Sequence, residues 1–402
     1  MQGDGGSGDG WRTEVCRDGA EFGRLGERWA SLYARCSTAT PFQSHSWLHS
    51  WWVSYGSPGA LRVVLVRRED GELVAAAPLM RTRGPLPVLT QLGGAITDFT
   101  DVLLDDACPG AAAALADALA GVARGAVIDL REVRPGASAE QVFARWRGPR
   151  RRLRDSLCLE LPAQPMDALL ARIPTGKAQQ RVRAKLRKLD ALGIDERIVP
   201  GDEVPAALDR LLRLHRLQWQ GRNVTAEHTS DRFAQHLARA VRPMVEGGDA
   251  RVTEFRLGGD VVAADLTLMS PRLAGGYLYG ADPELRARKV DVATMLLRHG
   301  AREAGASGRA VLSLLRGNEP YKRHWRPETV PNQRLMLTGR GTAPLLWLRA
   351  GAADGRRWAA RQARERAWVG RVVERLPGRP RGGGGGLTPP PPRPAAQRAT
   401  AP

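Results

Sequence analysis

The chain has 402 residues, of which 43% are hydrophobic and 26% charged, a composition that excludes a disordered or collagen-like protein and predicts one large or two medium domains. Lys and Arg outnumber Asp and Glu by 61 to 42, which gives a net charge of +19. Residues 341–402 carry twelve arginines and three acidic residues, so nearly half of the excess lies near the C-terminal end and does not by itself indicate nucleic-acid binding.

Both ends of the chain are predicted to be disordered. Residues 1–10 are rich in Gly and Asp, and residues 377–402 contain a run of five glycines and one of four prolines. Before this tail, residues 341–376 combine Trp358 and Trp368 with many arginines and predict a basic helical extension. We expect that helix either to make peripheral contact with an anionic membrane or to pack on the protein's own surface.

Between the ends, helical and strand patterns alternate, and the same order of elements occurs twice. In the first half, apolar spacing predicts helices over 22–33, 45–55 and 110–123 and strands at 61–66, 73–80, 102–104 and 127–130. In the second half it predicts helices over 208–219, 233–241 and 291–304 and strands at 251–257, 261–269, 274–280, 310–315 and 334–337. We therefore expect an α/β fold of two tandem halves, 11–160 and 161–340, each a mixed, mostly antiparallel sheet flanked by helices.

The cysteines and the N-terminal residues indicate a compartment. Cys16, Cys36, Cys108 and Cys158 are scattered, with none of the paired Cys/His spacings that bind zinc. Residues 1–10 lack the basic and apolar regions of a secretory signal, and no apolar run reaches the ~18 residues of a membrane span. These features predict a soluble, cytoplasmic protein with no metal site.

Several segments, in this order, resemble one family. Leu312–Trp325 (LSLLRGNEPYKRHW) is similar to the signature of the CelD/BcsL-type acetyltransferase-like family, in which a strand ends in a D-L-L-x-G-like turn before an acidic residue, a Tyr-Lys pair and a Trp. His215 and Trp219 match its H-x-x-x-W segment. Weaker matches are Phe42–Trp47, Thr97–Asp101, Val261–Asp265 and Tyr279–Pro283.

The resemblance covers residues 20–340 and implies two GNAT-like halves, as in the Fem-type peptidyltransferases. It implies transfer of an acetyl or other acyl group from acyl-CoA to an amine or hydroxyl of a small molecule or glycan precursor, with no metal and no specific nucleic acid. Ser313 departs from the family, which usually carries Asp there, so a carboxylate role is not available at that position.

Acyl transfer needs a base for the nucleophile and a proton donor for the leaving thiolate. Asp265 interrupts an apolar strand, where a carboxylate is costly unless it is paired or functional. His215 lies on the inward face of its helix and is either catalytic or a core residue. Glu319 is either a base or a helix cap, and Tyr321 and Lys322 are either proton donors or anchors of their loop.

The CoA pyrophosphate is expected at the start of the 291–304 helix, because backbone N–H groups and the helix dipole attract anions. Arg288–Ala293 (RKVDVA) approximates the Q/R-x-x-G-x-G/A motif, but Asp291 replaces the first glycine. An ordinary loop with Asp291 as the helix cap is the alternative. The candidate CoA-binding residues are Tyr279, Arg288, Lys289, Val292, Ala293 and Thr294.

The acceptor is expected to contact Asp98, Asp101, Trp219 and Arg316. Asp98 and Asp101 suit a cationic amine, although capping of a turn is the alternative function for both. The basic stretch 177–188 predicts an amphipathic helix whose charges either face solvent or contact CoA phosphates or a nucleic-acid backbone.

Two other functions fit the same pattern. One is a Fem-like transferase that uses aminoacyl-tRNA, which the basic helix favours. The other is a non-catalytic binding protein, which Ser313 and Asp291 favour as departures from the expected motifs.

Overall fold

The computed structural model describes residues 10–84, 86–220 and 226–375, so the predictions for residues 1–9 and 377–402 lie outside the described residues. The chain up to Ala350 forms one compact unit, and a second begins at Gly351. Helix α13 (Ala343–Arg375) covers the predicted helical extension and contains the described part of the second unit.

The first half follows the predicted order of elements. Its helices are α1 (Gly19–Arg24), α2 (Gly26–Ala34), α3 (His45–Tyr55), α4 (Ala111–Val122) and α5 (Ser138–Arg145). Its strands are β1 (Arg12–Cys16), β2 (Leu61–Arg67), β3 (Leu73–Arg81), β4 (Val88–Gln91), β5 (Leu103–Leu104), β6 (Val127–Val133) and β7 (Arg150–Pro162). The dipeptide Asp70-Gly71 between the strands predicted at 61–66 and 73–80 is a hairpin-turn signal. The hairpin of β2 and β3 is confirmed, with Gly71 at φ +87°, a conformation that favours glycine.

The second half repeats that order. Its helices are α6 (Met166–Ala171), α7 (Lys177–Ala191), α8 (Val204–Trp219), α9 (Asp231–Glu246), α10 (Pro283–Ala287), α11 (Val292–Ala306) and α12 (Pro320–Arg323). Its strands are β8 (Asp195–Ile198), β9 (Ala250–Leu257), β10 (Asp260–Met269), β11 (Leu273–Ala281), β12 (Val311–Arg316) and β13 (Glu328–Thr338). Ser230 caps α9 by accepting a 3.2 Å hydrogen bond from the Phe233 backbone, which fixes the start of this helix.

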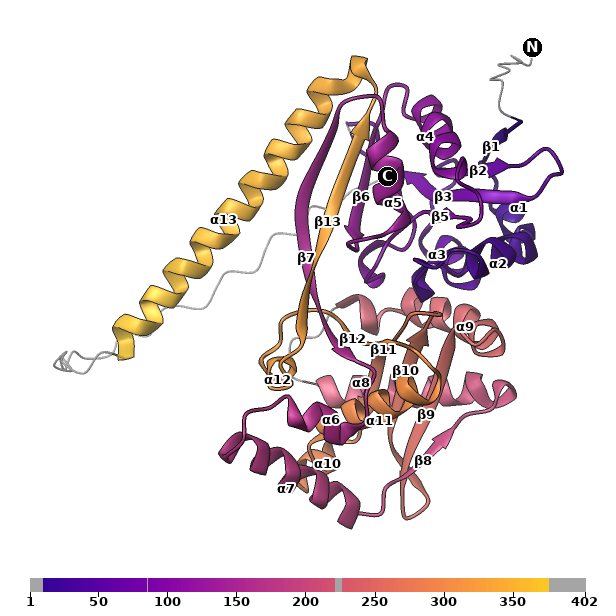
Figure 1. The fold of residues 1–402 in the computed structure, drawn as a ribbon. Helices are drawn as coiled ribbons and strands as arrows, with labels where there is room; N and C mark the ends of the chain where they lie inside the picture. The colour runs from indigo at the N-terminus through magenta and orange to yellow at the C-terminus, as the bar shows by residue number, and fades with distance from the viewer. Residues whose placement is uncertain (1–9, 85, 221–225, 376–402) are drawn as a thin grey trace, which may run out of the picture. The chain divides into compact units, whose positions relative to one another are not determined.

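The described strands form one sheet in the order β1-β2-β3-β4-β6-β13-β7-β12-β11-β10-β9-β8, and β5 pairs with β3. Pairing is antiparallel except between β4 and β6 and between β11 and β12, which gives each half one parallel pair. The long strands β7 and β13 pair with each other and run between the two halves (Figure 1). The α/β fold with two tandem, mostly antiparallel halves is therefore confirmed, while the boundaries at 160 and 340 stay predictions.

The central strands also carry a buried ionic cluster. Asp129 on β6 is 1% exposed and accepts two hydrogen bonds, of 2.6 and 2.5 Å, from the guanidinium of Arg334 on β13. Arg349, in the first turns of α13, donates a further 2.6 Å hydrogen bond to Asp129. These bonds tie β13 and the start of α13 to the first half.

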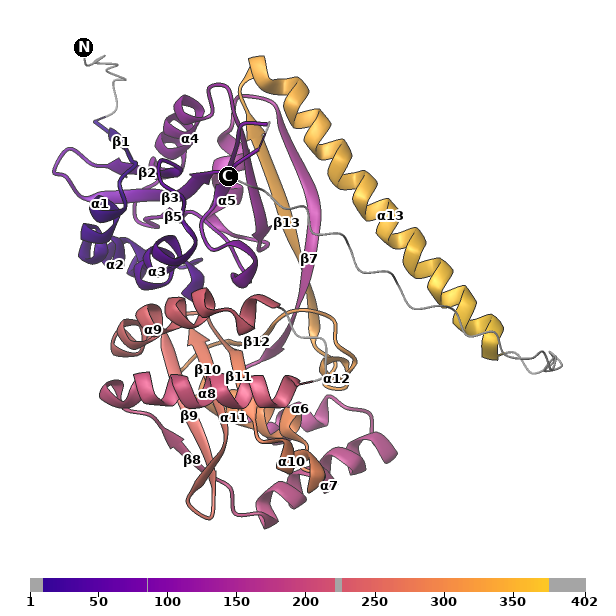
Figure 2. The same ribbon diagram turned by 180° about the vertical axis from the view of Figure 1, so that it is seen from behind.

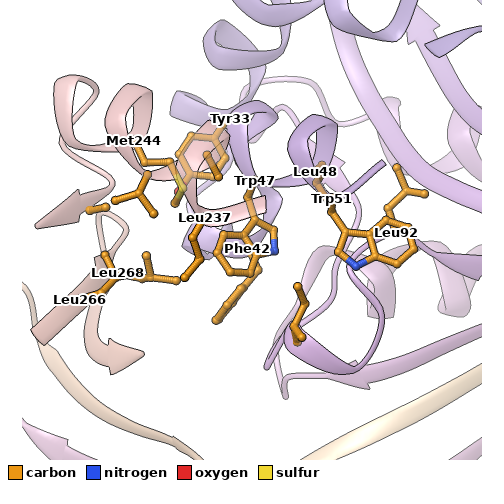
Figure 3. Packing of buried hydrophobic residues seen from close by; sticks show 14 of the residues in the cluster. Tyr33, Phe42, Trp47, Leu48, Trp51, Leu92, Leu237, Met244, Leu266 and Leu268 are labelled. Carbon is orange, nitrogen blue, oxygen red and sulfur yellow. The ribbon is translucent and has the colours of Figure 1, made fainter. Parts of the chain in front are cut away.

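Aromatic and aliphatic side chains from both halves share one core. In Figure 3, Phe42 and Trp47 of the first half lie beside Leu237, Leu266 and Leu268 of the second. The views in Figures 1 and 2 agree that α3 lies beside α9 at the junction of the halves.

Polar contacts cross the same junction. The Ser50 hydroxyl donates to the backbone carbonyl of His236 at 2.8 Å, and the Tyr277 hydroxyl donates to that of Ile96 at 2.8 Å. The continuous core and these bonds fix a first-half loop, residues 92–102, against the second-half sheet.

Candidate active site

The candidate site begins where the parallel strands β11 and β12 separate. The strands pair only at their start, from Leu273 opposite Val311 to Gly275 opposite Ser313. Leu315 then adopts φ +57°, and the Ser313 hydroxyl accepts a 3.2 Å hydrogen bond from the Leu315 backbone. Ser313 thus stabilises the irregular turn of this strand.

Beyond that point lies a cavity of about 520 Å³. Its walls come from β10, β11, α11, β12, the segment 317–325 and the first-half loop at 95–98. The predicted site residues that line it are Asp98, Asp265, Tyr279, Ala293, Arg316, Glu319, Tyr321 and Lys322. Eight residues predicted from five separate segments therefore line one cavity.

Asp265 is the most buried carboxylate of the cavity, with 4% of its surface exposed. The Thr267 hydroxyl donates a 2.6 Å hydrogen bond to it. Burial raises the pKa of Asp265, although the charge of His299 and the Thr267 hydrogen bond oppose that shift. A carboxylate with a raised pKa that faces a cavity has the properties of a general base.

His215 lies behind the cavity wall. Its Nδ1 donates a 2.7 Å hydrogen bond to the backbone carbonyl of Tyr279, and burial lowers its pKa. Helix α8 approaches β11 so closely at Gly280 that an added Cβ would lie 2.4 Å from the His215 backbone nitrogen. Trp219, one turn further along α8, has its ring 6.2 Å from that of His215 and also does not line the cavity. The structure thus positions His215 to hold Tyr279 rather than to face the cavity.

Arg316 lines the cavity and joins the two halves of the chain. It donates to Asp98 at 2.6 Å, to the backbone carbonyl of Ala95 at 2.8 Å and to Glu132 at 3.3 Å. Glu132 is itself buried and has φ +56°, a strained backbone conformation for a residue other than glycine. Because Arg316 donates to Asp98, the Asp98 carboxylate is paired with an arginine of the other half.

The segment after β12 is fixed by Lys322, which is 7% exposed. Its Nζ donates to the Arg316 carbonyl at 3.1 Å and lies 2.8 Å from the Glu319 carboxylate. Tyr321 is 48% exposed and contributes to the cavity wall. Lys322 thus has the anchoring contacts, whereas Tyr321 is accessible to a ligand.

The predicted phosphate site has an acidic cap. Asp291 is the N-cap of α11, accepts a 2.8 Å hydrogen bond from the Thr294 backbone and lies 2.5 Å from Lys185 of α7. The expectation of free N–H groups at this helix start is therefore wrong at Thr294, because the chain's own carboxylate binds there. Among the other predicted CoA-binding residues, Ala293 faces the cavity and Val292 lies outside its lining.

Basic residues surround this cap. Lys188 of α7 donates to the backbone carbonyls of Arg288 and Lys289, at 2.7 and 3.2 Å, and Arg288 forms a 2.6 Å ion pair with Glu284. The predicted amphipathic helix is confirmed, because α7 buries Val182 and Leu189 and exposes most of its cations. The α7 cations thus lie beside the predicted phosphate loop.

Asp101 lies outside the cavity despite being three residues from Asp98. It is 3% exposed and accepts hydrogen bonds from the backbone N–H groups of Ser138, at 2.9 Å, and Ala139, at 2.7 Å. Its carboxylate therefore caps the start of α5, which is the capping alternative and not the acceptor-binding role.

Sequence patterns did not point to His228, which lines the cavity from a short turn before α9. Its ring stacks on Phe233 at 4.8 Å and lies 5.9 Å from His215, and burial lowers its pKa. No local motif marks this histidine, because its position in the cavity wall depends on the packing of its turn against α8.

Across residues 10–84, 86–220 and 226–375, no three or more His, Cys, Asp or Glu side chains are grouped so that they could hold a metal ion. In the same part of the chain, no helix is both long and apolar enough to span a bilayer.

The parallel strand pair, the cavity between its ends and the helix α11 beside it define a GNAT-like fold. Residues 176–323 match the model of the acetyltransferase (GNAT) domain, which places the match on the half that contains the cavity. No curated protein matches the chain.

Solved structures share the architecture over both halves. A conserved protein of unknown function from Bacteroides thetaiotaomicron VPI-5482 aligns with a TM-score of 0.56 and 13% identity, over 81% of this chain and 100% of that one. FemX aligns with a TM-score of 0.55 and 12% identity, over 77% and 95% of the two chains. A C-terminal domain described as part of a lysylphosphatidylglycerol synthetase, from Agrobacterium fabrum, aligns with a TM-score of 0.50 and 16% identity, over 83% and 96%. At these identities the similarity concerns the fold alone.

Proposed function

We propose that this protein is an acyltransferase that moves an acetyl or other acyl group from acyl-CoA to an amine or hydroxyl. The observation that carries the proposal is the divergence of β11 and β12 around a cavity with a buried carboxylate, Asp265, in its wall. Strand edges that have separated offer backbone N–H and C=O groups to a ligand, and the amide-containing arm of CoA can pair with such groups.

Asp265 is the base in this mechanism. It accepts the proton of the acceptor's N–H or O–H as the nitrogen or oxygen attacks the thioester carbonyl. The C–S bond then breaks, and the leaving thiolate takes a proton from the Tyr321 hydroxyl. The raised pKa of Asp265 makes its carboxylate a stronger base than an ordinary aspartate. The hydrogen bond from Lys322 to the Arg316 carbonyl holds the segment that carries Tyr321.

The phosphates of CoA are assigned to the cations around the start of α11. Lys185, Lys188, Arg288 and Lys289 supply positive charge there, while Asp291 opposes an anion. We therefore expect the Asp291→Asn variant to bind CoA more tightly than the unmodified chain. Weaker binding in that variant would mean that the phosphates lie elsewhere.

The test combines ligand binding with turnover. Acetyl-CoA and longer acyl-CoAs are added to the full chain in a thermal-shift assay, and transfer is screened against amines and sugars. Asp265→Asn is expected to abolish transfer while keeping CoA binding, and Asp260→Asn, an exposed carboxylate on the same strand, is the matched control. No thermal shift with any acyl-CoA at millimolar concentration would overturn the proposal, and binding without transfer to any acceptor would favour the non-catalytic alternative.

A second candidate donor is aminoacyl-tRNA, as in the Fem-like alternative. The exposed cations of α7 favour it, together with the fold shared with FemX and with the domain described as lysylphosphatidylglycerol synthetase. Salt-sensitive binding of aminoacyl-tRNA, combined with no response to CoA, would establish this donor instead.

Three finer assignments belong to the same proposal. The assignment to the CelD/BcsL-type subfamily is based on the Leu312–Trp325 signature. From this assignment we propose a polysaccharide or cell-envelope precursor as the acceptor. A cytoplasmic location is supported by the four cysteines, which are all unpaired. Peripheral membrane contact is assigned to the arginines and tryptophans of residues 341–376.

A further inference from the structure

A buried histidine lies behind the candidate base. His299 of α11 is 1% exposed, and its Nδ1 donates a 2.6 Å hydrogen bond to Glu196 on the edge strand β8. Arg302 also donates to the Glu196 carboxylate, and the ring of Phe255 meets the imidazole edge-on at 5.3 Å. The imidazole is therefore held from two sides, with Nε2 as its remaining polar atom.

That remaining atom is buried and has no hydrogen-bond partner among the described residues. Within the described residues, neither Nε2 of His299 nor the hydroxyl of Thr253 has a hydrogen-bond partner, although both atoms are buried. Thr253 on β9 is directly opposite Asp265 on β10, so the two side chains lie side by side on one face of the sheet. Phe255, two residues after Thr253, points to this same face and contacts His299, which brings the imidazole to the Asp265 side of the sheet.

The two oxygens of Asp265 are in different surroundings. Oδ2 accepts the hydrogen bond from Thr267, whereas Oδ1 lies toward Gly276 of the cavity wall, where an added Cβ would be 3.3 Å away. The glycine leaves space for Oδ1 to contact an acceptor in the cavity. The carboxylate thus has one oxygen held by the protein and one oriented toward the cavity.

We propose that His299, held by Glu196, is a positioning residue that keeps the Asp265 carboxyl ionised and ready to accept the acceptor's proton. The inference rests on the proposed function, in which Asp265 is the base. His299 acts through the charge that its imidazole carries when protonated, and it does not line the cavity.

The other charged groups on this face do not substitute for His299. Arg251 of β9 is paired with Glu303 of α11, and Arg302 is bound to Glu196. On β11, burial raises the pKa of Tyr279, so its phenol stays neutral. The Glu196 carboxylate itself opposes ionisation of Asp265, whereas His299 favours it when its imidazole is protonated.

The test is a pH–rate profile of the full-length enzyme. His299→Gln removes the ionisable ring and keeps a hydrogen-bonding side chain near Glu196. His236→Gln, at another buried histidine outside the cavity, is the control. We expect the acid limb of kcat/KM to move up by about one pH unit in His299→Gln, so that the rate below the limb falls about tenfold. KM and the rate at high pH are expected to change little, and an unshifted limb would overturn the inference.

A second readout does not depend on activity. Carboxyl ¹³C NMR of aspartate-labelled protein, with Asp265 assigned from Asp265→Asn, measures its titration directly. The Asp265 carboxyl is expected to titrate at a higher pH in His299→Gln than in the unmodified chain, because His299 opposes the effect of burial on its pKa. The same titration midpoint in both proteins would overturn the inference. Full turnover by Asp265→Asn would instead overturn the proposed function and leave this coupling intact.

Discussion

Replacing Tyr321 and Lys322 separately distinguishes a chemical role from an anchoring role within one short segment. The sequence alone predicts that Tyr321→Phe or Lys322→Ala lowers turnover by ~10- to 100-fold without changing the melting temperature. The contacts of Lys322 change that expectation for the lysine. Its loss would remove one charge-assisted hydrogen bond, worth about 1.5–3 kcal/mol, and an ion pair to the half-exposed Glu319, worth about 0–1 kcal/mol.

For Lys322→Met we therefore expect a loss of about 2 kcal/mol of stability. In a cooperative unit of this size, that loss lowers the melting temperature by about 3 °C. Tyr321 is half exposed, so Tyr321→Phe is expected to keep the melting temperature and to lower turnover by ~10- to 100-fold. Calorimetry and steady-state transfer assays on both variants provide the comparison. Full turnover by Tyr321→Phe would refute its role as the proton donor, and an unchanged melting temperature for Lys322→Met would refute the anchoring argument.

Three further predictions concern the scaffold. Asp129→Asn is expected to lower the free energy of unfolding in urea by about 3–5 kcal/mol, because it leaves two arginines with a weaker partner. Arg349→Gln, at a more exposed site, is expected to lower it by about 1 kcal/mol. A larger loss for Arg349→Gln than for Asp129→Asn would contradict this account. Gly280→Ala is expected to lower the free energy of unfolding by about 1–3 kcal/mol, because the added Cβ forces α8 away from β11. Gly121 has open space around it, so Gly121→Ala is expected to be neutral or stabilising. Burial lowers the pKa of His236 to about 3, so the unfolded chain binds a proton that the folded chain excludes. The free energy of unfolding should therefore fall by about 1.4 kcal/mol per pH unit as the pH drops below ~6.5, and a slope unchanged by His236→Gln would exclude this histidine as the cause.

Elements with local signals were predictable from the sequence. The helix at 45–55 and the hairpin at 61–81 follow from apolar spacing and a turn dipeptide, and both are confirmed. Strand β7 was not predicted, because its first residues, Arg150–Asp155, are mostly charged and its partners are β12 and β13, far along the chain. Apolar spacing does predict parts of β12 and β13, but nothing in their local sequence shows that they pair with β7.

The cavity was predictable where its residues follow a single strand. Arg316 is the last residue of β12, and Glu319, Tyr321 and Lys322 follow it. Groups at and beyond the carboxyl end of a strand tend to meet in a crevice. The partner of Arg316 was not predictable, because Asp98 belongs to the other half of the chain.

The histidines behind and beside the cavity were missed for a related reason. His228 and His299 occur in segments without a motif, and their proximity to the cavity results from helix packing. Asp291 shows the opposite case, since its capping function is a local feature that the sequence did indicate.

Strand β13, from the second half of the chain, lies beside β6, and strand β7, from the first half, lies beside β12. This crossed arrangement determines when the protein can fold during synthesis. Strand β13 lies between β6 and β7, so the sheet of the first half is complete only after residue 338 has been made. A ribosome that has finished residue 160 holds a chain whose β6 edge has no neighbour, and an unpaired edge favours aggregation. The two halves are therefore expected to become protease-resistant together, after the last strand emerges, and a fragment that ends before β13 is expected to be recovered as aggregate.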